Sequence, residues 1–425
     1  MRRARDEGNT TTKEEVEEEE EEEEEVAEEG DRRESAEQAM RRMLGQLRRA
    51  MSENAEMRCL HADEAEKFMD SELALDDAVR ALEGAADSGA SAGCCAALGG
   101  VDALQELLVH ENEDVVADAV TVLSEMSDTS AVEESAAELD GRARFAAAAV
   151  RSAKCVPRLA AVAAGATTED ATVYAVLSCI EHLCEACPAE LCARLLQQQQ
   201  QGQQQQDAPV PFLELLARRI GAAAKRCSTA EDDVGKYAAE LAAVLASCDS
   251  GSDAMRNALG CACMEPLLHA ASAVRAWSPV CAEDIEFVEN LFDVIASMLA
   301  TPDNQTRFDD LEGSALLLII IKAKGLAQKG ALRALDLALQ NNKRGCTLFV
   351  EFLGLKTLFH ILMKGPCKHA AAKSKSDIRD FYGLQMPPSH LCSTPSHHRE
   401  FAHWMMTTRK RVVMRLIAVP ELGCG

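Results

Sequence analysis

Aromatic residues are scarce in this chain of 425 residues: they make up 4% of the sequence, with two tryptophans and three tyrosines. Alanine and leucine are abundant instead, and hydrophobic residues reach 47% of the total. This composition suits closely spaced helices better than strands, and it is sufficient for a large core. It therefore favours an all-α fold.

Long apolar runs are also missing. The longest, Ala315 to Ile321, is far shorter than the roughly 20 residues of a transmembrane helix. Met1 to Arg3 are followed by charge, not by the apolar segment of a signal peptide. The 17 cysteines lack the regular spacing of a small disulfide-linked domain. We therefore expect no membrane insertion, and a reducing compartment in which free thiols pack as small hydrophobic groups.

Two common motifs of catalysis and cofactor binding do not occur. There is no G-x-x-x-x-G-K-[ST] and no H-E-x-x-H. The sequence therefore predicts no catalytic residue, no cofactor and no enzymatic activity. An enzyme would require a dispersed group of titratable residues in one pocket, which a single sequence does not reveal.

Two groups of cysteine and histidine residues are candidate metal ligands. Cys179, Cys184, Cys187 and Cys192 have the spacing C-x4-C-x2-C-x4-C, but the first three fall on one predicted helix among apolar neighbours. A structural zinc site requires four ligands that converge, so core packing is the favoured interpretation. The second group, in the C-terminal tail, has irregular spacing and is not favoured either. Its members are His390, Cys392, His397 and His398.

Basic residues are strongly outnumbered, which gives a formal net charge of −26. The first thirty positions hold fifteen acidic and four basic residues, so a charge of about −15 remains for the rest of the chain. Binding to nucleic-acid phosphates requires clustered Lys and Arg, so we expect no direct nucleic-acid contact. The acidic balance favours a partner with Lys/Arg-rich segments.

The organising pattern is a helix, a polar turn and a second helix between Gly99 and Asp128. Short leucine-rich phrases of this kind recur, and longer amphipathic helices follow most of them, as at Val173–Cys187 and Phe287–Leu299. The spacing is around or above the armadillo/HEAT period of about 40–47 residues. The sequence therefore predicts an armadillo/HEAT-type α-solenoid of five or six units, in which Asp114 can cap the second helix. The phrases begin at Gly99, Lys154, Ala208, Cys263, Glu312 and Leu353.

Four regions are expected along the chain. Residues 1–50 form an acidic, largely disordered tail with an unbroken acidic run at Glu17–Glu25, and residues 51–98 form an N-terminal helical cap with a short helix pair. Residues 99–365 form the repeats, with a Gln-rich loop at 197–206. Residues 366–425 form an irregular divergent tail that contains helix-breaking prolines.

A solenoid presents an extended face that suits a peptide or a partner helix. Glu106, Glu214 and Glu265 lie in the short helices expected to line this face. They are the candidate partner-binding residues, because they could pair with basic side chains. The alternative for each is a solvated acidic residue without a partner.

Several segments, in the same order, resemble the beta-catenin-like protein 1 family. They include EKFMDSELALDDAV at Glu66, EFVENLFDVIASMLATPDNQTRF at Glu286 and FVEFLGLKTLF at Phe349. The resemblance runs from about Ala65 to Pro366 and is weakest from about Gly141 to Ser228. After Pro366 the family continues with a further helical region that this sequence does not match, and the basic N-terminal import signal of the family has no convincing counterpart.

This resemblance implies a nuclear, non-enzymatic armadillo scaffold associated with the spliceosome. Its partners would be splicing-complex proteins with basic, import-signal-like segments, and the sequence leaves open whether the chain forms a homodimer. The alternative is an import-receptor-like carrier of basic nuclear-localisation peptides. Such carriers use a repeated Trp/Asn array, whereas this chain has only Trp277 and Trp404.

Overall fold

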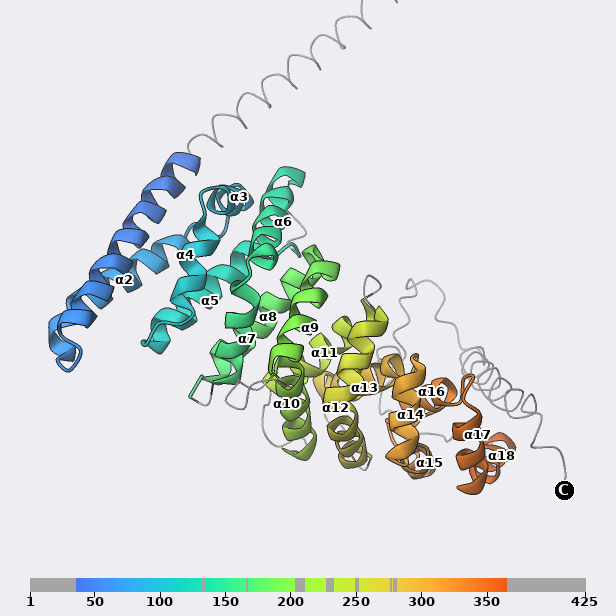
Figure 1. The fold of residues 1–425 in the computed structure, drawn as a ribbon. Coiled ribbons are helices and arrows are strands. Elements are labelled where there is room, and N and C mark those ends of the chain that lie inside the picture. The colour runs from blue at the N-terminus through green and yellow to red at the C-terminus, as the bar shows by residue number, and fades with distance from the viewer. Residues whose placement is uncertain are drawn as a thin grey trace, which may run out of the picture. The chain divides into compact units, whose positions relative to one another are not determined.

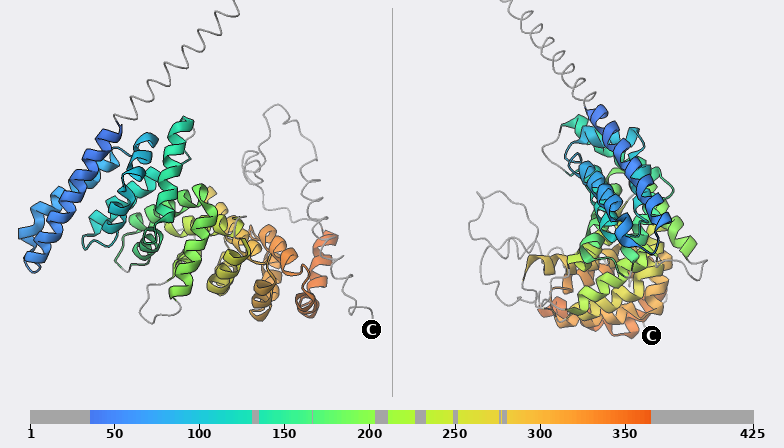
Figure 2. Two further views of the ribbon diagram at one scale, coloured as in Figure 1. Left: turned by 45° about the horizontal axis from the view of Figure 1, so that its top comes forward. Right: turned by 90° about the vertical axis from the view of Figure 1, so that its left-hand side faces the viewer.

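The computed structural model describes residues 36–130, 135–165, 167–202, 211–226, 233–248, 252–275, 277 and 281–364. Within these ranges the regular secondary structure is helical and contains no strand, which confirms the all-α prediction. The chain divides into two compact units, Met1–Arg194 and Leu195–Gly425, and α9 spans their boundary. Figures 1 and 2 show the helices of each unit.

Unit 1 begins, in its described part, with a helix over residues 36–60, which packs with α2. The remaining helices of unit 1 follow in chain order. They are α2 (Ala65–Glu83), α3 (Gly89–Ala97), α4 (Gly100–Leu107), α5 (Glu113–Ser127), α6 (Ala136–Arg151), α7 (Cys155–Ala164), α8 (Asp170–Ala186) and the first part of α9 (Pro188–Gly202).

In the described part of unit 2, α10 to α13 are longer than α14 to α18. Its longest helix, α12, contains Pro266 in its interior. The helices are α10 (Phe212–Arg226), α11 (Asp233–Ser247), α12 (Ser252–Val274), α13 (Ala282–Met298), α14 (Pro302–Asp310), α15 (Gly313–Ala323), α16 (Gln328–Ala338), α17 (Lys343–Glu351) and α18 (Gly354–Lys364).

The long helices stack on one another within each unit. In unit 1, α5 packs between α2 and α8; in unit 2, α13 packs between α11 and α16. Apolar residues at helical spacing explain the stack, as in α5, where Val115, Ala119, Val122 and Met126 are all buried. No such helix can bury its apolar stripe alone, so each depends on its neighbours in the array.

Two close contacts between α3 and α6 in unit 1 require glycine. A Cβ atom at Gly89 of α3 would collide with the backbone of Glu138 in α6, and one at Gly141 of α6 would collide with the backbone of Gly89. At Gly99, the backbone has φ of 73°, a left-handed conformation that favours glycine and starts α4. The first of these contacts brings the backbones of α3 and α6 together directly.

The N-terminal boundaries differ from the prediction. Residues 36–50 are helical, with Met40, Leu44 and Leu47 fully buried, so the expected tail over 1–50 extends too far. These apolar residues recur at intervals of four and three, but the charged residues between them concealed the pattern.

The expected short helix pair at Ala65–Leu82 is the single helix α2, which lacks an internal glycine or proline. The cap expected over 51–98 also includes α3, which stacks on α6 as part of the array.

Two local predictions are also corrected. Residues 197–202 belong to α9 and not to a loop, because glutamine is a good helix former that lets the helix continue; residues 203–206 lie outside the described part.

The cap of α5 is Asn112, whose side chain accepts a hydrogen bond from the Asp114 backbone N–H at 2.8 Å. Asp114 lies in the first turn instead. The acidic run Glu17–Glu25 and the tail over 366–425 also lie outside the described residues.

Candidate functional site

Glu106, the first candidate partner-binding residue, already has partners inside the chain. It lies on α4, and its carboxylate is 3.1 Å from both the Lys154 ammonium and the Arg158 guanidinium at the start of α7. The hydrogen bond from Lys154, followed by the contacts with Arg158, lowers the pKa of Glu106 below its usual value despite partial burial. Its charge is therefore largely compensated before any ligand binds.

Glu214 and Glu265 lie in unit 2, on α10 and α12. Glu214 is half-buried beside Cys263, whose pKa is raised to about 12 by burial and, next, by the charge of Glu214. Glu265 is exposed at the edge of a groove between the two helices. All three candidate glutamates lie on helices outside the α2, α5, α8 stack of unit 1 and the α11, α13, α16 stack of unit 2.

A different set of carboxylates lies together on the stacked helices of unit 1. We call it the α2/α5 carboxylate surface. It forms two rows: Asp76 of α2 with Asp118 of α5, and Glu83 of α2 with Glu125 of α5. Asp87, four residues after the end of α2, lies beside the second row.

The spacing of the two rows follows from helical geometry. Asp76 and Glu83 are seven residues apart, as are Asp118 and Glu125, so each pair lies on one face of its helix with about 10.5 Å between the row positions. Asp118 faces Asp76, and Glu125 interacts with Glu83. The surface therefore presents two acidic rows, two helical turns apart.

Burial and mutual repulsion act on both rows. Burial raises the pKa of Asp118, and the neighbouring Asp76 carboxyl raises it further, while Arg80 opposes the shift. Burial also raises the pKa of Glu125, and the charges of Glu83 and Asp87 add to the effect. Negative charge thus exceeds the positive charge available nearby, and an added cation would be stabilised here.

Two arginines provide positive charge near these carboxylates. The exposed Arg80 bridges the first row, with its Nε 3.2 Å from Asp76 and 3.3 Å from Asp118. Arg142 of α6 is buried and donates hydrogen bonds to the backbone carbonyls of Glu125 and Asp87, so it joins α5 to the segment after α2. Within the described residues, no arginine side chain bridges Glu83 and Glu125 as Arg80 bridges Asp76 and Asp118, and the charge of Arg142 offsets only part of the upward pKa shift of Glu125.

Apolar side chains continue the same face of α2. Met69 and Leu73 are 54% and 57% exposed. Met69, Leu73, Asp76 and Arg80 follow one another at intervals of four, three and four residues, which places them on one face of the helix. On α8, the third helix of this stack, Tyr174 is 45% exposed. The face can therefore contact both the charged and the apolar parts of a ligand.

Sequence reasoning missed the α2/α5 carboxylate surface. The repeated interval of seven residues between acidic positions was a usable signal on each helix. The pairing of the helices was not, because the members of each row are 42 residues apart in the chain. Only the packing of α2 on α5 brings them together.

The metal and tryptophan alternatives gain no support from the geometry. Cys179, Cys184 and Cys192 are buried in the helical core, and in the described part of the chain no three His, Cys, Asp or Glu side chains converge as metal ligands. Trp277 stacks on Phe287, with ring centroids 5.7 Å apart. Trp404 and the His390–His398 group lie outside the described residues.

No helix among the described residues is both long and apolar enough to cross a bilayer. Known structures with a similar arrangement include an engineered protein (TM-score 0.43, 16% identity, 75% of this chain and 97% of that one) and a designed armadillo repeat protein (TM-score 0.38, 16% identity, 63% and 94%). These similarities concern the fold alone.

The sequence is similar to beta-catenin-like protein 1 of Homo sapiens, with 30% identity over 338 residues, and of Mus musculus, with 29% over 343 residues. Both matches cover 78% of this chain and 56% of the relative. The homologue from Schizosaccharomyces pombe is 24% identical over 329 residues, which cover 76% of this chain and 54% of that protein. The chain thus spans just over half the length of these relatives.

Residues 12–384 match the family described as "Catenin-beta-like, Arm-motif containing nuclear". The match includes the helical array, with its stacked long helices, and extends beyond it at both ends. The chain is therefore a member of the catenin-beta-like family of Arm-motif-containing nuclear proteins.

Proposed function

We propose that this protein is a non-enzymatic scaffold in the nucleus that binds Lys/Arg-rich segments of splicing-complex proteins. The observation that carries the proposal is the excess of carboxylates on the α2/α5 surface, where Arg80 bridges the first row and the charge of Arg142 offsets only part of the upward pKa shift of Glu125. The description of the family as nuclear supports the location. The link to splicing depends on the resemblance to the beta-catenin-like protein 1 family.

The distance between the two rows limits the spacing of basic residues in the ligand. In a polyproline II segment, which has three residues per turn, residues i and i+3 lie on the same side and are about 9.3 Å apart, at roughly 3.1 Å per residue, which is close to the spacing of the two rows. A segment with Lys or Arg at these positions would place one cation at Glu83 and Glu125 and the other beside Asp76 and Asp118. Arg80 already occupies part of the second site, so we expect the Glu83/Glu125 row to contribute most to affinity.

The first test measures binding of a fluorescein-labelled peptide with Lys or Arg at positions i and i+3 by fluorescence anisotropy. Reversal of the free row in Glu83→Lys/Glu125→Lys should weaken binding at least tenfold, and added salt should weaken wild-type binding strongly. The matched control is Glu53→Lys/Glu56→Lys on the exposed side of the helix over 36–60, which makes the same change in net charge.

Equal losses in the two double variants would mean that net charge alone attracts the peptide, and the site would be rejected. A separate test addresses the splicing role. The full chain immobilised in nuclear extract should retain splicing-complex subunits, and the Glu83→Lys/Glu125→Lys variant should not. If the peptide binds but the wild-type chain retains no splicing protein, the basic-segment site stands and the assignment to splicing fails.

A further inference from the structure

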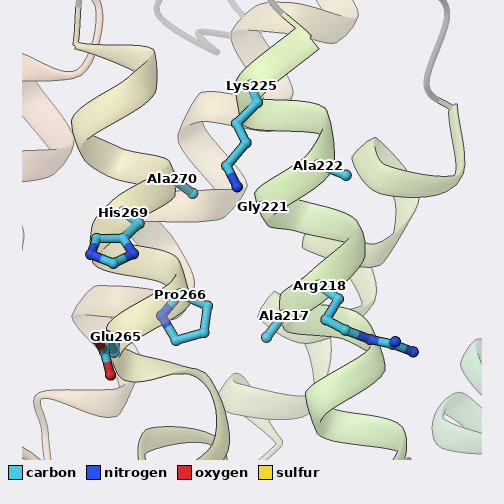
Figure 3. A pocket seen from close by; sticks show the side chains of 9 residues that line it. All are labelled: Ala217, Arg218, Gly221, Ala222, Lys225, Glu265, Pro266, His269 and Ala270. Carbon is cyan, nitrogen blue, oxygen red and sulfur yellow. The ribbon is translucent and has the colours of Figure 1, made fainter.

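A groove of about 500 Å³ runs between α10 and α12 in unit 2 (Figure 3). Its walls consist mainly of small side chains, and charged or polar groups lie along its edges. It is distinct from the α2/α5 carboxylate surface, which is in unit 1. The lining residues are Ala217, Arg218, Gly221, Ala222, Lys225, Glu265, Pro266, His269 and Ala270.

Gly221 leaves the wall of α10 open. No heavy atom lies within 4 Å of the position that a Cβ atom would occupy at this residue. Glycine in a helix interior is destabilising by roughly 0.5–1 kcal/mol relative to alanine, and here packing within the chain does not require it. The absence of a side chain allows another backbone or side chain to approach α10 closely.

The edge of the groove is basic, although the whole chain carries a net charge of −26. Lys225 extends from α10 into the space between the helices, and His269 projects from the facing side of α12. Both residues are exposed, and neither forms an ion pair with another residue in the described part of the chain. Arg218 points away from the groove, and Glu265 lies at the far end from Lys225.

We infer that the groove between α10 and α12 binds an acidic segment of a protein partner. A carboxylate of that segment lies between Lys225 and His269, and its small or apolar side chains pack over Gly221 and Ala270. We expect an acidic ligand because one end of the groove is basic. We expect it to have small side chains where it contacts the walls, because the lining residues there are small. This ligand is opposite in charge to the basic segment proposed for unit 1, so the two sites can be tested separately.

The test uses the full chain and a fluorescein-labelled peptide of repeated Glu-Ala-Ala triplets, with binding measured by anisotropy at low ionic strength. Lys225→Glu should raise Kd at least tenfold. Gly221→Leu, which fills the groove without changing charge, should do the same. Because leucine forms helices better than glycine and the space is open, Gly221→Leu should leave the melting temperature unchanged or raise it, so its loss of binding cannot be attributed to misfolding.

Lys322→Glu on α15 is the matched control, since this lysine is exposed and the change in charge is identical; its Kd should remain within twofold of wild type. Three results would overturn the inference. They are unaltered binding by Gly221→Leu, an equal loss in Lys322→Glu, and no binding by the wild-type chain, as when another segment of the chain fills the groove.

Discussion

The stacked helices of the two units differ in whether their acidic residues have a basic partner on the neighbouring helix. In unit 2, Lys236 of α11 lies 3.3 Å from Asp284 of α13, and Arg333 of α16 lies 2.7 Å from Asp293 of α13. In unit 1, the facing acids of α2 and α5 lie next to one another. Arg80 bridges Asp76 and Asp118, and the charge of Arg142 offsets only part of the upward pKa shift of Glu125. Asp284 and Asp293 of unit 2 thus have a basic partner on a neighbouring helix, whereas Glu125 of unit 1 faces another acid.

The largest expected effect comes from breaking the buried pair in unit 2. Asp284 is almost fully buried, and burial opposes the charge of Lys236, but the hydrogen bond and charge of Asp284 outweigh this and raise the pKa of the lysine. Lys236→Ala would leave a buried carboxylate without its counter-ion and should cost about 3 kcal/mol of unfolding free energy. Urea unfolding of the full chain measures it. Adding Asp284→Asn should restore most of the loss, and an unimproved double variant would contradict this account.

The second change gives unit 1 a counter-ion of its own. Thr121 of α5 lies between Asp118 and Glu125 at helical intervals of three and four residues and is half-buried. Thr121→Lys should weaken binding of the basic peptide about tenfold, or about 1.4 kcal/mol, because the new ammonium competes for both rows. Thr121→Gln, of similar size and without charge, should bind nearly as wild type. A lysine variant that binds normally would mean that the ligand lies elsewhere.

A smaller effect is expected from relieving repulsion in unit 1. The pKa of Glu125 is raised by burial and then by Glu83 and Asp87. The folded state therefore binds more protons than the unfolded state just above the ordinary value of 4.5, and unfolding free energy falls as pH rises through that window. Glu125→Gln should gain less than about 1 kcal/mol at neutral pH, because this exposed group is screened by solvent.

The pH profile separates this explanation from a general effect of the substitution. The gain of Glu125→Gln should disappear as pH falls below about 4.5, since the wild-type carboxyl is then protonated and uncharged. A gain that persists at pH 3 would contradict electrostatic relief. Thermal unfolding at several pH values supplies the comparison.

The smallest effect is expected for the exposed pair of unit 2. The side chains of Arg333 and Asp293 are 47% and 44% exposed. Exposed pairs contribute between about 0 and 1 kcal/mol, so Arg333→Ala should reduce the unfolding free energy by about 0.5 kcal/mol or less. A loss as large as that of Lys236→Ala would show that exposure does not distinguish the two pairs.

Much of the helical array was predictable from periodicity. The long helices expected at Val173–Cys187 and Phe287–Leu299 correspond to α8 and α13, with shifts of a few residues at their ends. Their apolar stripes repeat every three or four residues, and this signal is local. The recurring leucine-rich phrase is equally local, and its first occurrence contains α4.

The helices that escaped prediction have weaker local signals. The helix over 36–60 hides Met40, Leu44 and Leu47 among charged residues, and α3 consists largely of alanine and glycine, with α6 packed against it. Their stability comes from the neighbours against which they pack. Without those neighbours, alanine and glycine do not indicate a core helix.

Composition, helical periodicity and the acidic balance were determined by the sequence itself, because each depends on residue types and on positions within one or two helical turns. The tertiary structure alone decided which charges are compensated. Glu106 has partners on α7, Asp284 has one on α11, and Glu125 faces another acid. The physical reason is that Coulomb energy depends on distances of a few ångströms through space and on local burial, and only packing brings such residues from separate helices together.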